Sequence, residues 1–146
     1  MSGTTEPPIL ERSVLKAREW IAETADELGI DDHRAAYRSL RAVLHAVRDR
    51  IGVNEAAQLA AQLPELIRGM YYEDWVPSRV PETYRDRDEF LRRISREARL
   101  AGQTEASFAA VAVIKVLSRH VSAGEITDVM QGLPAELRDL LEPAVR

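Results

Sequence analysis

Hydrophobic residues recur every three or four positions along most of this chain, and this spacing predicts amphipathic helices. The first stripe comprises Val14, Ala17, Ile21, Ala25 and Leu28. The second comprises Tyr37, Leu40, Leu44, Val47 and Ile51. Gly29 and Gly52 follow the two stripes, and a glycine commonly ends a helix. Because no stretch alternates apolar and polar residues for long enough to form a strand, we expect an all-α fold.

Polar residues in front of several apolar runs predict where the helices begin. Asp31 or Asp32 can cap the second helix, and Thr104 is expected to cap the long helix of the second half. Two capping boxes are expected, formed by Asp86 with Glu89 and by Ser122 with Glu125. Together with the apolar stripes, these signals predict about eight helices.

The chain contains an internal repeat, because the segment 42–68 aligns with the segment 112–138 without a gap. The identical pairs include Ala42/Ala112, Val43/Val113, Glu55/Glu125, Leu63/Leu133, Pro64/Pro134 and Arg68/Arg138. The same register also pairs Trp20 with Phe90, and we call this register the repeat alignment. We therefore expect two tandem pseudo-symmetric repeats that pack as one helical bundle and superpose by a twofold rotation.

The expected organisation is a single helical domain over residues 9–146, preceded by a disordered segment, residues 1–8. Repeat one is placed at 13–70, the connector at 71–85 and repeat two at 86–142. Within repeat two, Ser107–Leu117 is apolar nearly all round. It is expected to be the buried spine of the shared core, whereas its counterpart in repeat one keeps a polar face.

The 146 residues include no cysteine, which excludes disulfides, thiolate catalysis and cysteine-ligated metals. The net charge of -4 argues against a general nucleic-acid-binding protein. No apolar run reaches the ~18 residues of a membrane span, and the N-terminus lacks the basic and apolar regions of a signal peptide. A soluble, cytoplasmic protein with no membrane partner is expected.

Three sequence segments carry a resemblance to a known family. They are AYRSLRAVLHAVRDRIGVNEAAQLAAQLPELIRGMYYEDW, DEFLRRI and VLSRHVSAGEITDVMQGLPAELRDL. Over residues 14–142 the chain resembles the bacterial family known as domain of unknown function 2267. Residues 63–75 are the most specific part, although Asp74 stands where many members of the family have glycine. The resemblance implies a duplicated helical fold and no particular activity.

The sequence contains none of the usual catalytic signatures, neither a GxSxG nor an HExxH motif, and no glycine-rich phosphate loop. The Glu-x-x-His pattern of di-iron bundles is also absent. The three histidines, His33, His45 and His120, are scattered, and we expect them on polar helix surfaces. We therefore expect no enzymatic activity, no cofactor and no metal.

A basic stripe lies along one face of the second helix. It consists of Arg34, Arg38, Arg41, His45 and Arg48. Such a row can bind phosphate or an acidic partner, and nucleic acid is an alternative ligand. However, Glu19, Glu23 and Glu27 form an acidic stripe on the preceding helix, which a short turn makes an antiparallel neighbour. We favour a structural interpretation, in which the two stripes neutralise each other.

The connector is rich in large aromatic rings, namely Tyr71, Tyr72, Trp75 and Tyr84. A flexible linker has a different composition. The rings either fill the groove between the repeats or line a site that a partner or a ligand enters. Packing is the more frequent use of such rings, and we expect Trp75 to be largely buried.

The sequence therefore favours a non-enzymatic interaction or scaffold protein that binds a protein partner or associates with itself. The alternative is a small-ligand-binding bundle with a pocket at the repeat junction near Trp75. An exposed apolar patch would favour the first function, and a polar-lined cavity at the junction would favour the second.

Overall fold

In the computed structural model, residues 5–145 are described, and they form an all-α fold without a strand. The α-helices are α1 Pro8–Leu28, α2 His33–Arg50, α3 Val53–Ala60, α4 Glu65–Tyr72, α5 Arg87–Ala98, α6 Gln103–His120, α7 Ala123–Gln131 and α8 Ala135–Leu141. Two short 3-10 turns follow α4 and α8, η2 Pro77–Arg79 and η3 Glu142–Val145. Residues 1–4 of the segment expected to be disordered lie outside the described residues, and its last residue, Pro8, already belongs to α1.

Most of the predicted helix ends are confirmed. Asp32 accepts hydrogen bonds from the backbone of Arg34 and Ala35. The side chains of Asp86 and Ser122 accept hydrogen bonds from the N–H groups of Glu89 and Glu125. Gly29 ends α1 with φ 68, in the left-handed region that glycine tolerates best. The expected Thr104 cap is wrong, because α6 begins at Gln103, directly after Gly102, and has no side-chain cap.

The helix ends follow the repeat alignment. Helix α6 begins and ends at the positions equivalent to the two ends of α2. Helices α7 and α8 begin at the positions equivalent to the first residues of α3 and α4. Helix α5 ends at the position equivalent to the last residue of α1. The helix contacts are reciprocal: α1 packs on α6 and α5 on α2, while α2 contacts α6 and α3 contacts α7. A twofold rotation that superposes the two halves stays a prediction.

The core lies between the two long helices, and both contribute to it. In α2 an unbroken run of residues from Ala42 to Arg48 is buried. In α6 Phe108 and Lys115 are exposed, although most of the residues around them are buried. The core is therefore built on both long helices, whereas the sequence predicts α6 as its spine. Each half presents the buried face of its long helix to the other.

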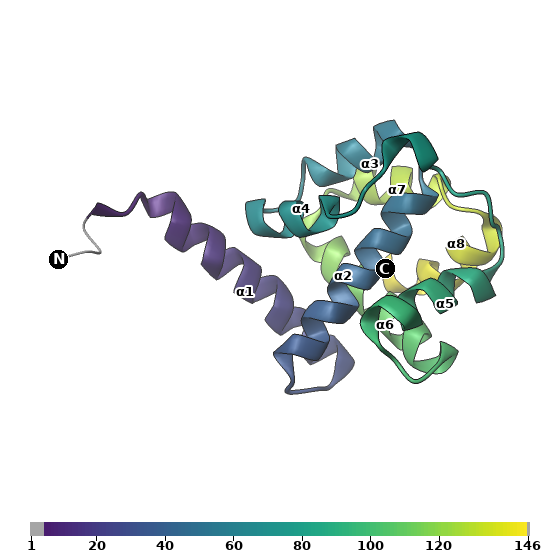
Figure 1. Ribbon diagram of the computed structural model, residues 1–146, viewed down its shortest axis with the longest axis horizontal. Helices are drawn as coiled ribbons and strands as arrows, with labels where there is room; N and C mark the ends of the chain where they lie inside the picture. Colours follow the sequence, from purple (N-terminus) through teal and green to yellow (C-terminus); the bar gives the residue numbers. More distant parts are fainter. Residues whose placement is uncertain (1–4, 146) are drawn as a thin grey trace.

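The first helix extends beyond the bundle. Figure 1 shows the N-terminal half of α1 projecting from the body of the molecule, while its C-terminal half packs in the bundle. The corresponding helix of the second half, α5, is only 12 residues long, against 21 for α1. The additional N-terminal turns of α1 thus have no helical counterpart in the second half.

No single helix of residues 5–145 combines the length and the hydrophobicity needed to cross a membrane. Within these residues, only α5 and α6 taken together reach the required length and composition, and their axes differ by 87°.

Candidate functional site

The basic stripe of α2 points mostly into the protein, toward α4 and α5. Arg41 donates to Glu73 at 2.9 Å and to Glu97 at 2.6 Å. His45 places Nδ1 2.8 Å from the Glu97 carboxylate and Nε2 2.8 Å from the carbonyl oxygen of Met70. His45 is buried, so its expected place on a polar surface is wrong. Two of the five stripe residues are thus already paired with acceptors from both halves of the chain.

Arg48 is the most enclosed residue of the stripe, with 2% of its surface exposed. Its guanidinium donates to the carbonyl oxygens of Tyr71 and Glu73 at 2.6 and 2.7 Å, and to Asp49 at 2.8 Å. Arg38 donates to the carbonyl oxygen of Ala98 at 3.3 Å. The stripe therefore ties α2 to the ends of α4 and α5 and leaves chiefly the exposed Arg34 for an outside anion.

The acidic residues of α1 do not neutralise this stripe, which corrects the expectation drawn from the sequence. Glu23 pairs with His120 at 3.0 Å and with Arg119 at 3.2 Å, both on α6. Glu27 pairs with Arg119 and, at 3.9 Å, with Lys115. The reason is how α1 packs on the core. The Trp20 ring stacks on the His120 ring, with the two centroids 4.7 Å apart, and this contact turns the acidic face of α1 toward α6 instead of α2.

The aromatic connector is packed against the fold. Tyr71 is fully buried and donates to the carbonyl oxygen of Ala56 at 2.9 Å, and burial raises its pKa. Tyr72 and Trp75 are partly buried against the core, with ring centroids 5.2 Å apart. Arg93 lies over the Tyr84 ring at 4.7 Å, a cation–π arrangement. These contacts support the packing interpretation.

Asp74, in the middle of the connector, adopts φ 63. This left-handed conformation favours glycine, which agrees with the glycine that the family resemblance leads us to expect there. The Asp74 carboxylate lies 3.4 Å from Arg41.

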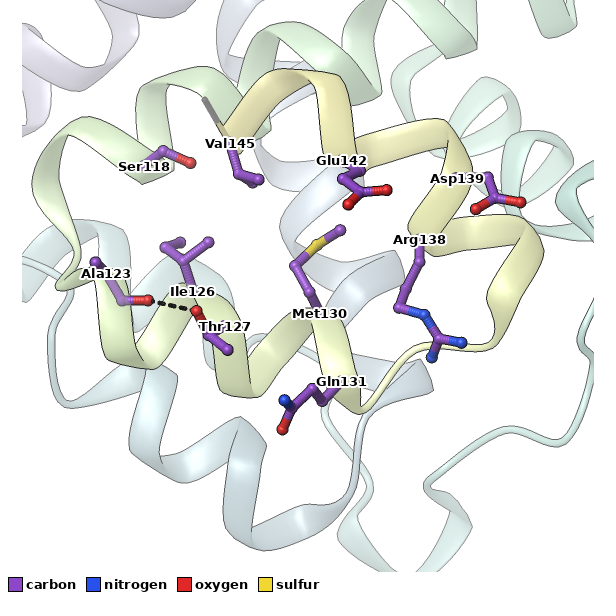
Figure 2. Close-up of a pocket in the computed structure, with 10 residues that line it drawn as sticks. All are labelled: Ser118, Ala123, Ile126, Thr127, Met130, Gln131, Arg138, Asp139, Glu142 and Val145. Carbon is purple, nitrogen blue, oxygen red and sulfur yellow. Dashed lines mark hydrogen bonds between the residues drawn. The ribbon is translucent and has the colours of Figure 1, made fainter.

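A cavity of about 410 Å³ opens in the second half, between the end of α6, α7 and the α8–η3 segment (Figure 2). Its lining consists of Ser118, Ala123, Ile126, Thr127, Met130, Gln131, Arg138, Asp139, Glu142 and Val145. Ile126, Met130 and Val145 make it apolar, and Asp139 and Glu142 add two carboxylates. The hydroxyl oxygen of Ser118 is buried and has no hydrogen-bond partner within residues 5–145. Trp75 does not line this cavity, so the alternative pocket near Trp75 stays a prediction.

In the repeat alignment, Ser118 of the cavity corresponds to Arg48, and Val145 to Trp75. Arg48 and Trp75 are larger side chains, and both pack within the first half.

Three carboxylates meet where α3 contacts α7. Glu55, Glu125 and Asp128 each place one oxygen within 4.8 Å of the others. Glu125 is only 7% exposed. Burial and the neighbouring Glu55 raise the pKa of Glu125 to about 8. In the sequence, Glu55 and Glu125 are recognisable only as identical residues of the repeat alignment, and Glu125 also as a capping residue. Their equivalent positions are the sequence signal that could have predicted this cluster, because equivalent helices of two repeats that share one core can lie side by side.

The comparisons with known proteins identify a family for this chain. The model of the family described as Uncharacterized conserved protein (DUF2267) matches residues 17–140. No curated protein matches the chain significantly. Since the family match covers most of the chain, the protein belongs to the DUF2267 family.

Proposed function

We propose that this protein is a non-enzymatic interaction module that associates with a second copy of itself through the projecting half of α1. This surface is called the α1 arm and comprises residues 8–19. The observation that carries the proposal is an exposed apolar face on this arm, which contributes little to the protein's own core.

Four large apolar residues of the arm are exposed, Ile9, Leu10, Val14 and Leu15. Leu10 and Val14 are 51% and 40% exposed. They continue toward Ala17 and Ile21 with spacings of four, three and four residues, the a/d spacing of helices that pair side by side. Leu66, on α4 beside α1, is also exposed.

The charges along the arm favour a second, antiparallel copy as the occupant. Glu11 and Arg12 lie near the N-terminal end of the arm, whereas Lys16, Arg18 and Glu19 lie toward the body, where Lys16 lies 3.2 Å from Glu19. In an antiparallel pair Glu11 of each arm can face Arg18 of the other, and the helix dipoles oppose each other favourably. A partner of other sequence would need the same alternation of charge.

Sedimentation equilibrium tests the proposal. The wild-type chain is expected to dimerise with a Kd on the order of 10–100 μM, because the interface is small and partly polar. The double variant Leu10→Glu/Val14→Glu is expected to be monomeric. Leu15→Glu is the matched control, since Leu15 is equally exposed but lies on another face of α1 and is expected to leave dimerisation intact. A wild-type chain that stays monomeric at about 1 mM contradicts the proposal.

A second candidate function is binding of a small amphipathic amine in the cavity of the second half. Its apolar lining would contact a ring or an alkyl chain, and its carboxylates would attract the ammonium group. Asp139 and Glu142 form no ion pair with another side chain of residues 5–145, which favours a cationic ligand.

Benzylamine and benzoate form a matched pair of probes for this candidate, because they share a ring and differ in charge. In NMR titrations, benzylamine is expected to shift the resonances of Ile126 and Met130, and benzoate is not. Met130→Trp, which fills the cavity, is expected to abolish the shifts. Equal shifts with both probes would rule out recognition of the amine.

A further inference from the structure

We propose that Glu55, Glu125 and Asp128 bind one divalent cation at the contact between α3 and α7. The site would join the two halves of the molecule, because Glu55 belongs to the first half and Glu125 and Asp128 to the second. It is independent of the self-association proposed above and lies on different helices.

The first argument is geometric. One carboxylate oxygen from each residue lies within 4.8 Å of the other two. Oxygen ligands lie about 2.0–2.6 Å from Mg²⁺, Mn²⁺ or Ca²⁺, so two ligands of the same ion are separated by no more than about 5 Å. The three oxygens thus already have the separation that a shared ion requires.

The second argument is the state of the buried oxygens. The Oε2 atoms of Glu55 and Glu125 are both buried and have no hydrogen-bond partner within the described residues. Glu125 as a whole is more than nine-tenths buried, and its carboxylate lies against that of Glu55. A buried carboxylate is costly unless a proton or a cation compensates it.

The third argument concerns what is missing around the cluster. None of its three carboxylates forms an ion pair with a Lys, Arg or His side chain between residues 5 and 145. Glu23, Glu27 and Glu97, by contrast, all pair with basic side chains. Within residues 5–145, the cluster therefore has no basic side chain as a partner.

The ligand chemistry identifies the class of ion. An all-oxygen set of carboxylates suits Mg²⁺, Mn²⁺ or Ca²⁺, and no sulfur or nitrogen ligand is present in the cluster that would select a softer metal. Asp128 is exposed and lies at the solvent side of the cluster. Water can complete the coordination there.

Titration with Mn²⁺, followed by electron paramagnetic resonance of the free ion, tests the site. The wild-type chain is expected to bind one Mn²⁺ with a Kd below about 1 mM at pH 7. Glu125→Gln and Glu55→Gln are each expected to weaken binding at least about tenfold, and Asp128→Asn less strongly. Glu105→Gln removes an exposed acid on α6 and serves as the control with unchanged affinity.

Circular dichroism establishes whether each variant is folded. If Glu125→Gln does not fold, Glu55→Gln tests the site in its place. Mn²⁺ binding that is equal in wild type and in both glutamine variants would overturn the proposal. A wild-type chain that binds no Mn²⁺ at about 10 mM would also overturn it.

Discussion

His45 and Glu97 are in contact across the two halves, with Nδ1 of His45 2.8 Å from a carboxylate oxygen of Glu97. In the repeat alignment His45 corresponds to Lys115, and Glu97 corresponds to Glu27. Lys115 and Glu27 lie 3.9 Å apart. The same pair of positions therefore joins α2 to α5 and α6 to α1. The first pair is much more enclosed, and its loss is expected to matter more.

Replacing His45 by Leu is expected to destabilise the protein by about 1–3 kcal/mol, because the Met70 carbonyl and the Glu97 carboxylate lose a buried partner. Lys115→Leu, at the exposed equivalent position, is expected to cost under about 1 kcal/mol. Urea unfolding of the two variants measures both values. Equal losses would show that burial of the His45 pair contributes nothing.

Arg48→Met is expected to cost about 3–5 kcal/mol, since the carbonyl oxygens of Tyr71 and Glu73 and the carboxylate of Asp49 lose their donor in a buried site. Arg34→Met, on the exposed part of the same stripe, is the control and is expected to change stability by less than about 0.5 kcal/mol. Thermal unfolding with circular dichroism compares them. A mild effect of Arg48→Met would mean that the connector does not depend on this residue.

Trp75→Ala is expected to cost about 2–3 kcal/mol, less than for a fully buried ring, because Trp75 is only partly buried. Its Nε1 is buried without a hydrogen-bond partner in the described part of the chain. Trp75→Phe removes this unsatisfied group and is therefore expected to cost much less than Trp75→Ala. Calorimetric melting of both variants checks the order. A Trp75→Ala protein that melts like wild type would indicate that the ring serves a partner.

Stability is expected to fall as pH rises from about 4.5 to about 8 in the presence of EDTA, owing to Glu125. The folded pKa of Glu125 is raised to about 8, from 4.5, so the folded state holds a proton that the unfolded state loses earlier. The stability that Glu125 contributes is complete below pH 4.5 and is lost as Glu125 is deprotonated in the folded state. Glu125→Gln is expected to flatten this part of the stability profile. An identical slope in variant and wild type would exclude Glu125 as the source.

The protein is expected not to bind duplex DNA or single-stranded RNA in about 0.1 M salt, where real phosphate contacts give a steep salt dependence. Arg38, Arg41 and Arg48 are already engaged with internal acceptors, and the net charge is -4. Fluorescence anisotropy measures the binding of both nucleic acids. Micromolar binding that weakens in an Arg38→Ala/Arg41→Ala variant would contradict the expectation and restore the basic stripe as a ligand site.

Local features of this fold were already determined by the sequence. Stripes at helical spacing, the caps Asp32, Asp86 and Ser122, and Gly29 define helix ends through contacts within a few residues, so they can be identified without knowing the rest of the structure. The internal repeat likewise predicted that helix ends would recur at equivalent positions, because equal apolar patterns form equal helices.

Only the tertiary structure decided which faces meet. Sequence neighbours suggested that Glu23 and Glu27 face the stripe of α2, but the rotation of α1 about its axis depends on Trp20 packing on α6. That packing brings Glu23 to His120, 97 residues away. Long-range partners of this kind follow from how both halves bury their apolar faces together, and no local pattern encodes them.

At the candidate sites, too, some features were determined by the sequence and others only by the tertiary structure. The apolar spacing of Leu10, Val14 and Ala17 is visible in the sequence, yet only the fold leaves Leu10 and Val14 exposed by extending α1 beyond the bundle. The sequence showed the identity of Glu55 and Glu125, but their approach requires that α3 and α7 pack across the interface between the halves. Chemical identity is a property of the sequence, whereas proximity and burial arise when distant segments close one core.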